Sequence, residues 1–200
     1  MLSSWAVPAD SENSLSSPIA ALSAAEEPER VNAAQSLYAA GCAMALDATR
    51  AWRADPVLFP LFTGHPVVGV AVQPETFEKI WKANGSPELA DVPPDQDAQE
   101  FELHFSPEIS LDILTTRDPG GPGAIARFLA RRGEGVQQVE FPVTNVDCAT
   151  QLLRERFGIA PLYPVTRPGA NSTRVNFFLI PAAAQTKVLI ELVESPSVSR

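Results

Sequence analysis

The sequence predicts an α+β fold in which one unit, a strand followed by a helix and further strands, occurs twice behind an N-terminal helical extension. Between residues 67 and 194, short segments alternate apolar and polar residues with the period of two expected of strands with one buried face. Helical patterns at 74–83 and 146–157 each follow the first strand of one half. The same order of elements therefore recurs, as expected of an internal duplication.

The composition limits the size of the domain and the kind of partner. Two hundred residues, 45% of them hydrophobic, supply one core of ordinary size and some additional chain. The formal net charge of -9 argues against nucleic acid, because proteins that bind it concentrate Lys and Arg on one face. It disfavours membrane surfaces for the same reason. We expect a small-molecule partner.

The cysteine count and the lengths of the apolar runs indicate in which cellular compartment the protein is expected. Cys42 and Cys148 are too few for a disulfide framework, and we expect both to be free thiols. No run of the sequence approaches the roughly 20 apolar residues that span a bilayer. The segment 1–15 lacks the basic start and the apolar core of a secretory signal. A cytoplasmic location is therefore the expectation.

Residues 1–60 are expected to form the extension. Residues 1–30 predict a mobile arm, since Ser, Ala, Glu and Pro offer little apolar surface to offset the entropy of ordering. Residues 31–52 combine many alanines with a partly apolar face, which predicts one helix that covers a sheet or a partner subunit. The proline-punctuated segment 56–66 is a connector.

Residues 61–120 are expected to form the first unit, and residues 121–200 a linker helix and the second unit. The first unit has a strand at 67–73, a helix at 74–83, a polar loop at 84–97, and strands at 99–105 and 109–115. The second has a short helix at 124–132, a strand at 136–143, a helix at 146–157, and strands at 159–165, 173–180 and 187–194. The first unit is thus one clear strand shorter than the second.

Stacking these strands gathers the polar side chains on one face. On the strand 173–180, Val175, Phe177 and Leu179 are expected to point toward the core. The polar faces then collect His65, Glu100, Glu102, His104, Asp112, Gln138, Glu140, Arg174, Asn176 and Glu191. Antiparallel sheets often have one face in water, so these residues either meet solvent or, if the sheet curls, converge in a cleft. In a cleft, crowded carboxylates shift one another's pKa values or share a cation.

Motifs in the second half carry a family resemblance. They are Ile125-Ala-Arg-Phe-Leu129, Arg132-Gly-Glu-Gly-Val-Gln-Gln138, Leu152-Leu-Arg-Glu-Arg156, Pro168-Gly, Ser172-Thr-Arg-Val-Asn-Phe177 and Val188-Leu-Ile-Glu-Leu-Val-Glu194. Residues 125–194 resemble the C-terminal half of methylmalonyl-CoA epimerases in the vicinal oxygen chelate superfamily, which also contains glyoxalase I and the bleomycin-resistance proteins. Residues 67–117 resemble the N-terminal half more loosely, and residues 1–60 show no resemblance.

The resemblance implies two paired βαβββ modules whose curled mixed sheet forms a U-shaped cleft around a divalent metal. Of the four family ligand positions, Glu191 and Asp112 keep carboxylates, whereas Val67 and Gln138 stand where the family has histidines. His65 has the strand parity of Val67 and is the candidate replacement. Two metal states remain open: a Co, Mn, Mg or Zn ion held by His65, Asp112, Gln138 and Glu191, or no metal.

The resemblance also implies catalytic groups. Glu102 matches the family's base, which removes the proton beside a thioester, with Glu140 or His104 as a second acid or base. Substrate-binding candidates are Arg174, Asn176 and Gln138, with Arg127, Arg131 and Arg132 for a coenzyme A tail.

Three functions remain open on this reading. The first is an isomerase of the methylmalonyl-CoA epimerase kind that acts through an enolate on a CoA thioester. The second is a divergent enzyme of secondary metabolism on another substrate, acting without metal. The third is a protein that binds and sequesters a small molecule. A homodimer is expected from the resemblance.

Overall fold

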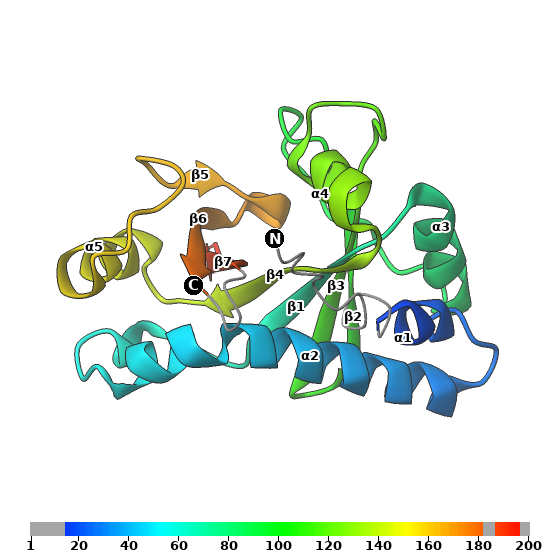
Figure 1. The fold of residues 1–200 in the computed structure, drawn as a ribbon, viewed down its shortest axis with the longest axis horizontal. Coiled ribbons are helices and arrows are strands. Elements are labelled where there is room, and N and C mark those ends of the chain that lie inside the picture. Colours follow the sequence, from blue (N-terminus) through cyan, green and yellow to red (C-terminus); the bar gives the residue numbers. More distant parts are fainter. Residues whose placement is uncertain (1–14, 182–186, 197–200) are drawn as a thin grey trace, which may run out of the picture.

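A seven-stranded mixed sheet, curled into a half-barrel, organises the computed structural model, which describes residues 15–181 and 187–196 (Figure 1). The N-terminal part and first unit contain α1 (Ser16–Ala21), α2 (Glu27–Ala54), the short 3₁₀ helix η2 (Phe59–Leu61), β1 (Val67–Ala71), α3 (Pro74–Ala83), β2 (Gln99–Ser106) and β3 (Ile109–Thr115). The linker helix and second unit contain α4 (Ala124–Arg132), β4 (Gly135–Pro142), α5 (Val146–Phe157), β5 (Arg167–Pro168), the 3₁₀ helix η3 (Ala170–Ser172), β6 (Arg174–Pro181) and β7 (Lys187–Glu194).

The strand order shows the duplication. It runs β2-β3-β1-β4-β7-β6-β5, with β1 parallel to β3 and β4 parallel to β7. The two halves meet where β1 and β4 pair antiparallel. Each half thus places its first strand at the centre of the sheet and its last strand beside it. The predicted α+β fold of two paired units behind a helical extension is confirmed.

The outer face of the sheet is covered by α2, α3 and α5. Buried residues of α2 recur at helical spacing, among them Ala34, Leu37, Ala45 and Trp52, and they pack into the two apolar clusters of the outer face. Gly41 lies where the helix crosses β1, and a Cβ atom there would meet Val68 Cγ1 at 2.5 Å. The long helix can therefore lie directly on the centre of the sheet (Figure 1).

The N-terminal segment differs from its prediction. Residues 1–14 lie outside the described residues, but the rest of the predicted mobile arm contains α1 and the start of α2. Ile19 and Leu22 are completely buried in the cluster that also holds Phe77 of α3. A few apolar residues suffice here because a neighbouring helix and the sheet complete their surroundings.

Helix α4 lies on the opposite side of the sheet from α2 (Figure 1). Its residues Ile125 and Leu129 pack against Ala71 and Leu114 at one end of the inner face. The remainder of the inner face is left open for the cleft described below.

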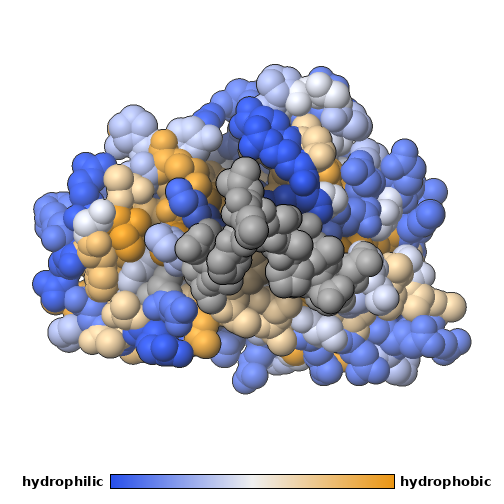
Figure 2. All heavy atoms as spheres, in the orientation of Figure 1, coloured by the Kyte–Doolittle hydropathy of each residue, from blue (hydrophilic) through white to orange (hydrophobic). Residues whose placement is uncertain are grey.

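The predicted strand at 159–165 does not form. This segment is irregular: the backbone N of Leu162 donates to the carbonyl of Phe177 in β6 at 2.7 Å, and the short strand β5 pairs with β6 further along. Pro161 and Pro164 lack the N–H groups that a strand ladder requires, which explains the loss of pairing. Leu162 and Val165 in this part of the chain are exposed apolar side chains. Figure 2 shows apolar atoms gathered on the left of the visible face, on the side where α5 and β5 lie in Figure 1.

Both cysteines are free, as predicted, with Cys42 half-buried and Cys148 exposed. Among the helices of the described residues, none has both the length and the apolar character that crossing a membrane requires.

Candidate active site

The inner face of the sheet forms the floor of a cleft of about 1290 Å³ between the two halves. Helix α4 and the loop before β2 line one side of it, and residues 162–173 line the other. Polar side chains of β2, β3, β4 and β7 project into this space. We call them the acidic cluster: Glu100, Glu102, Asp112, Gln138, Glu140 and Glu191.

The strand register places part of the acidic cluster in one row across four strands. Gly69 of β1 pairs with Asp112 on one side and with Gln138 on the other. Asp112 in turn pairs with Glu102 of β2. On β4 and β7, Glu140 pairs with Glu191. Residues far apart in the chain, from Glu102 to Glu191, therefore line one surface.

Gln138 joins two of the carboxyl groups. Its Nε2 atom donates hydrogen bonds to Glu191 Oε2 at 2.6 Å and to Glu140 Oε1 at 3.0 Å. Both hydrogen bonds are shielded from solvent at the floor of the cleft, because Gln138 and Glu191 are almost fully buried. The amide thus supplies the donor that two buried carboxylates need.

Gly69 makes room for this arrangement. A Cβ atom at Gly69 would lie 2.5 Å from Gln138 Cγ and 3.0 Å from Leu114 Cδ1. The side chain of Gln138 therefore crosses the bare backbone of β1 on its way to the carboxyl groups. The glycine is required by this close approach.

Burial raises the pKa values of the carboxyl groups. It raises the pKa of Glu140 to about 7, although the hydrogen bond from Gln138 favours the charged form. It likewise raises the pKa of Glu100 to about 7. Two groups of the cluster are thus poised to take up or release a proton near neutral pH.

Asp112 and Glu191 are shifted in the same direction. Burial raises the pKa of Asp112 well above its ordinary value, and the nearby carboxylates of Glu100, Glu140 and Glu191 add to the effect. Burial followed by the charge of Glu140 does the same for Glu191, against the hydrogen bond from Gln138. Like charges this close cannot all be ionised, so the cluster holds protons in common.

Glu102 and His104 occupy the more open part of the cleft. Both line it, and both are exposed to solvent. His104 Nδ1 lies 2.9 Å from Ser110 Oγ and 3.6 Å from Glu102 Oε1. The three residues predicted to act as acid or base, Glu102, His104 and Glu140, therefore share one cleft.

His65 lies elsewhere. It precedes β1, is exposed, and lines a second, smaller pocket together with Trp52 and Phe141. The cleft-lining residues do not include it. His65 was expected to point the same way as Val67, two residues later. It does not enter the cleft, because β1 begins only at Val67 and the chain before it is not extended along the strand.

Arg174 and Asn176 are also absent from the cleft, because β6 faces the opposite way from the prediction. Phe178 and Ile180 enter the outer core, and Phe177 lines the cleft. By strand alternation Arg174 and Asn176 share the outer face. The run Asn-Phe-Phe-Leu-Ile has apolar residues at both parities, so alternation alone assigned the wrong face.

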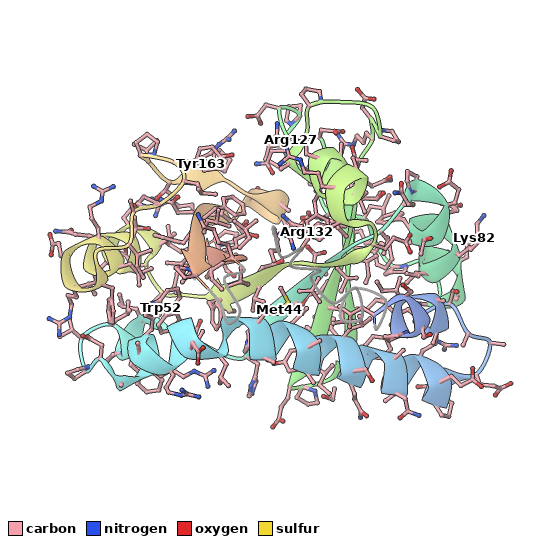
Figure 3. All side chains as sticks on the ribbon, in the orientation of Figure 1. Met44, Trp52, Lys82, Arg127, Arg132 and Tyr163 are labelled. Atoms are coloured by element: carbon pink, nitrogen blue, oxygen red, sulfur yellow. The ribbon has the colours of Figure 1, made fainter. Side chains whose placement is uncertain are left out.

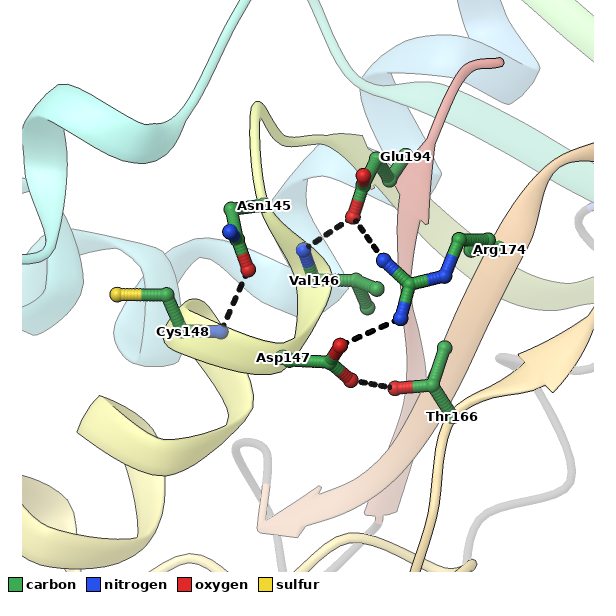
Figure 4. Close-up of polar contacts among 7 residues, drawn as sticks. All are labelled: Asn145, Val146, Asp147, Cys148, Thr166, Arg174 and Glu194. Atoms are coloured by element: carbon green, nitrogen blue, oxygen red, sulfur yellow. Dashed lines mark hydrogen bonds and ion pairs between the residues drawn. The ribbon is translucent and has the colours of Figure 1, made fainter. Parts of the chain in front are cut away.

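Arg174 instead ties together the ends of three elements (Figure 4). It pairs with Asp147 near the start of α5, and its Nη1 donates to Glu194 Oε2 at 3.0 Å. Glu194 also accepts from the backbone N of Val146 at 2.8 Å, and Thr166 donates to Asp147. Asn176, 1% exposed, accepts from the backbone N of Phe177. Arg174 thus has structural partners, whereas the Nδ2 atom of Asn176 is buried without a hydrogen-bond partner among the described residues.

Several cleft residues were not predicted as site residues. Glu100 had been placed only on the polar face, and Gln137 joins Gln138 in the cleft because the β1–β4 register shifts after Gly69. No local sequence signal marks such a bulge. Arg167 also lines the cleft, with its guanidinium 4.6 Å from the centre of the Tyr163 ring.

One of the three arginines predicted to hold a coenzyme A tail reaches the cleft. Arg127 lines it, whereas Arg131 and Arg132 are not among its lining residues. Figure 3 shows Arg127 on α4 and Tyr163 on the segment before β5, on the two sides of the inner face. Arg127 and Arg167 thus stand at the sides of the cleft, together with loop carboxylates such as Asp95 and Asp97.

Polar contacts join the two sides of the cleft. Asp91 and Asn171 exchange hydrogen bonds of 2.9 Å, and Gln96 Nε2 donates to the carbonyl of Pro168 at 2.8 Å. Arg167 pairs with Asp95 at 2.6 Å. The loop of the first unit is therefore fastened to the β5 segment of the second, which bounds the cleft at this edge.

The donor set does not fit the metal that the fold implies. In the β1–β4 ladder, Val67 and Gln138 lie on either side of the paired residues Val68 and Val139. These are the two positions without imidazole, and Val67 has no donor atom. Gln138 turns its NH₂ group toward the carboxylates rather than an oxygen toward an ion. Within residues 15–181 and 187–196, no group of three or more His, Cys, Asp or Glu side chains could hold a metal ion.

Comparison with protein-family models and with curated proteins found no match. Solved structures do match. Methylmalonyl-CoA epimerase from Mycobacterium tuberculosis shares 31% sequence identity with a TM-score of 0.56, over 69% of this chain and 92% of that one.

Two further structures are more distant. A methylmalonyl-CoA epimerase in complex with methylmalonyl-CoA and NH₄⁺ is 23% identical, with a TM-score of 0.52, over 70% of this chain and 97% of the other. A variant of the Streptomyces coelicolor methylmalonyl-CoA epimerase in complex with 2-nitronate-propionyl-CoA is 22% identical, with a TM-score of 0.51, over 68% and 99%. At these identities the likeness is one of fold.

The comparison with the Mycobacterium tuberculosis epimerase shows more than the fold, because the 31% sequence identity extends over nearly the whole of that protein. The curled seven-stranded mixed sheet with its helices fits the vicinal oxygen chelate fold. The chain therefore belongs to the vicinal oxygen chelate superfamily, and its similarity within that superfamily is to the methylmalonyl-CoA epimerases.

Proposed function

We propose that the cleft catalyses proton transfer at a carbon atom next to a thioester or carbonyl group, as an epimerase that works through an enolate. The observation that carries this proposal is that Glu102 and Glu140 line one cleft, where burial raises the pKa of Glu140 to about 7. A general acid or base works best when its pKa lies near the working pH. The comparison with an epimerase at 31% identity supports the reaction class.

Glu102 and Glu140 divide the proton transfer between them in this proposal. The Glu102 carboxylate removes the proton from the carbon atom, the C–H bond breaks, and its electron pair moves onto the carbonyl oxygen. The protonated Glu140 then gives its proton to the opposite side of the same carbon. The roles of the two groups are exchanged after one turnover, and proton exchange with water or the reverse reaction restores them.

The remaining acidic cluster keeps Glu140 ready for this step. The hydrogen bond from Gln138 orients the Glu140 carboxyl group. Asp112 and Glu191 share protons, which lowers the negative charge around Glu140. His104, 3.6 Å from Glu102, positions the base. No step in this scheme passes through a metal ion.

A CoA thioester is the proposed substrate class. Related epimerases are described in complex with methylmalonyl-CoA and with 2-nitronate-propionyl-CoA. Here Arg127 and Arg167 stand at the sides of the cleft, where guanidinium groups suit phosphates. Gln137 Oε1 is buried without a hydrogen-bond partner among the described residues and suits an amide N–H of the pantetheine arm.

One observation favours a second candidate, an enzyme of the same superfamily that acts without metal on another substrate. Among the described residues, the carboxyl groups at the cleft floor pair with no basic side chain, apart from the contact between Glu102 and His104. The free carboxylate of methylmalonyl-CoA would meet these groups, whereas a thioester or ketone without a carboxylate would not.

Deuterium exchange tests the proposal. The protein is incubated in D₂O with methylmalonyl-CoA, in the presence of EDTA, and incorporation at C2 is followed by mass spectrometry. We expect incorporation by the wild type, and a loss of at least about a hundredfold in Glu102→Gln and Glu140→Gln. Glu155→Gln, on the exposed face of α5, is the matched control and keeps the wild-type rate.

Other outcomes separate the alternatives. Exchange with a carboxylate-free 2-methylacyl-CoA but none with methylmalonyl-CoA supports the second candidate. Binding of either thioester with no exchange at all indicates a protein that sequesters its ligand, and overturns the proposed reaction. The homodimer and the cytoplasmic location stay predictions, the first testable by sedimentation.

A further inference from the structure

A second pocket, of about 440 Å³, lies apart from the proposed active site. It is bounded by the C-terminal part of α2, by the segment from Phe59 to Pro66, and by Phe141 and Pro142 of β4. Phe141 belongs to the core of the outer face, so the sheet separates most of this pocket from the cleft. Pro142 lines both.

Three aromatic rings form its base. The rings of Trp52 and Phe62 are stacked at 6.2 Å, and both meet Phe141 edge to face at 6.3 and 5.9 Å. Trp52 is 1% exposed, and Figure 3 shows it directed from α2 toward the sheet. Phe59 completes the apolar lining at the edge, half exposed. Because Trp52 and Phe141 are buried, they support Phe62, and Phe59 and Phe62 are the rings that a ligand can contact.

The rest of the lining is basic or neutral. Arg53 and His65 both line the pocket and are exposed. Across residues 15–181 and 187–196, Arg53 makes no ion pair and no side-chain hydrogen bond. None of the lining residues is Asp or Glu. In a chain with a net charge of -9, this is a local basic site.

We propose that this pocket binds a small aromatic carboxylate, its ring system against Phe59 and Phe62 and its carboxylate at Arg53 and His65. An aromatic base alone would also suit an organic cation, but the two basic side chains and the absence of a carboxylate from the lining disfavour one. A guanidinium group and an imidazole at one edge provide the donors that a carboxylate requires. The volume accommodates a bicyclic ring.

The segment that carries His65 is held firmly enough to form such a site. The backbone N of Thr63 donates to the carbonyl of Pro142 at 2.9 Å, and Phe62 forms a β-bridge with Val143. Gly64 takes a positive φ of 63°, which turns the chain toward β1. His65 is thereby presented to the pocket from a loop fastened to β4.

Calorimetric titration with 2-naphthoate tests this proposal, with neutral 2-naphthamide as the isostere. We expect saturable binding of 2-naphthoate to the full chain at one site. The double variant Arg53→Gln/His65→Gln is expected to lose about tenfold in affinity for the carboxylate and to change little for the amide. Both side chains are exposed, so the variant is expected to fold. Arg50→Gln, on the same helix and paired with Asp47 outside the pocket, is the matched control.

Two variants fix the place of binding. Phe59→Ala removes a half-exposed ring of the pocket edge and is expected to weaken both probes severalfold. His104→Gln changes the other histidine, in the cleft, and is expected to leave both affinities unchanged. The proposal is overturned if 2-naphthoate does not bind at millimolar concentration, if it binds the double variant as tightly as the wild type, or if His104→Gln is the variant that weakens it.

Discussion

The Nε2 atom of Gln138 lies 2.6 Å from Oε2 of Glu191, and the same nitrogen donates to Glu140. The amide of Gln138 thus contacts one carboxyl group on its own strand, β4, and one on the neighbouring strand, β7. It stands where the resemblance placed an imidazole, and it serves the carboxylates instead of an ion.

Replacement of Gln138 by Leu is expected to raise the pKa of Glu191 and of Glu140 further. The hydrogen bonds from the amide favour the charged forms, and the variant removes them while burial remains. We expect an upward shift of about one pH unit in the carboxyl titration followed by ¹³C NMR. Gln137→Leu removes a neighbouring amide that makes no such bond and should leave the titration in place. A downward shift in Gln138→Leu would contradict the interpretation.

A methyl group at position 69 is expected to displace Gln138. The Cβ atom of Gly69→Ala would lie 2.5 Å from Gln138 Cγ, so the amide must leave its carboxylate partners. We expect a loss of about 1–3 kcal/mol in the free energy of unfolding, measured with urea. Gly135→Ala, at the start of β4, is the matched control, since nothing lies within 4 Å of its added Cβ atom. Equal stability of the two variants would show that the Gly69 contact is not required.

The stability of the protein is expected to fall as pH rises through neutrality. The folded-state pKa of Glu140 and of Glu100 is about 7, above the ordinary value of 4.5, so the folded state binds more protons than the unfolded state between these values. The contribution is fully present below about pH 4.5 and is lost as pH rises through about 7. Urea denaturation at pH 5.5 and pH 8 should show a decrease on the order of 1 kcal/mol or more. Glu140→Gln should reduce this difference, and a stability that increases toward pH 8 would refute the assignment.

Arg174 is expected to affect stability and not ligand affinity. It joins β6, β7 and the start of α5 from a partly exposed position outside the cleft (Figure 4). Arg174→Gln should lower the free energy of unfolding by about 0.5–1 kcal/mol, because exposed ion pairs are screened by solvent. Affinity for a thioester substrate, measured by calorimetry, should match the wild type. A tenfold loss of affinity without a loss of stability would restore the substrate-binding role predicted from the sequence.

Two imidazoles are expected to create a metal site in the cleft. Val67→His/Gln138→His places donors at both positions beside Asp112 and Glu191. We expect Zn²⁺ or Co²⁺ to stabilise the folded double variant, which raises its thermal midpoint. At a hundredfold excess of the ion over Kd, the gain in the free energy of unfolding is about 2.7 kcal/mol. The wild type should show no gain, and Asp112→Asn in the variant background should reduce it. A gain by the wild type equal to that of the variant would show that its own side chains bind the ion.

Regular alternation and helical spacing were enough to predict most of the elements. The bounds of α3, α4, α5, β3 and β7 agree with the predicted segments, because each has a consistent apolar face and a clear boundary. The strand at 159–165 failed because prolines interrupt its ladder, and the short α1 was hidden in a polar composition. Element type follows local pattern, whereas pairing depends on backbone donors that a hydropathy pattern does not count.

Part of the candidate site could also be predicted. Glu102, Asp112, Glu140 and Glu191 reach the cleft as expected, because their strands alternate strictly and one face is apolar. Arg174 and Asn176 do not, since β6 is apolar at both parities. His65 does not, because a connector without regular structure has no parity to extend.

The sequence by itself determined the duplicated α+β fold, the strands that carry the carboxylates, and the lack of imidazole at Val67 and Gln138. Only the tertiary structure decided what those residues do together. The register of β1 against β3 and β4 brings Asp112, Gln138 and Glu191 onto one floor, and burial there raises the pKa values of the carboxyl groups. Register and burial arise from contacts between distant segments, so no local pattern encodes them.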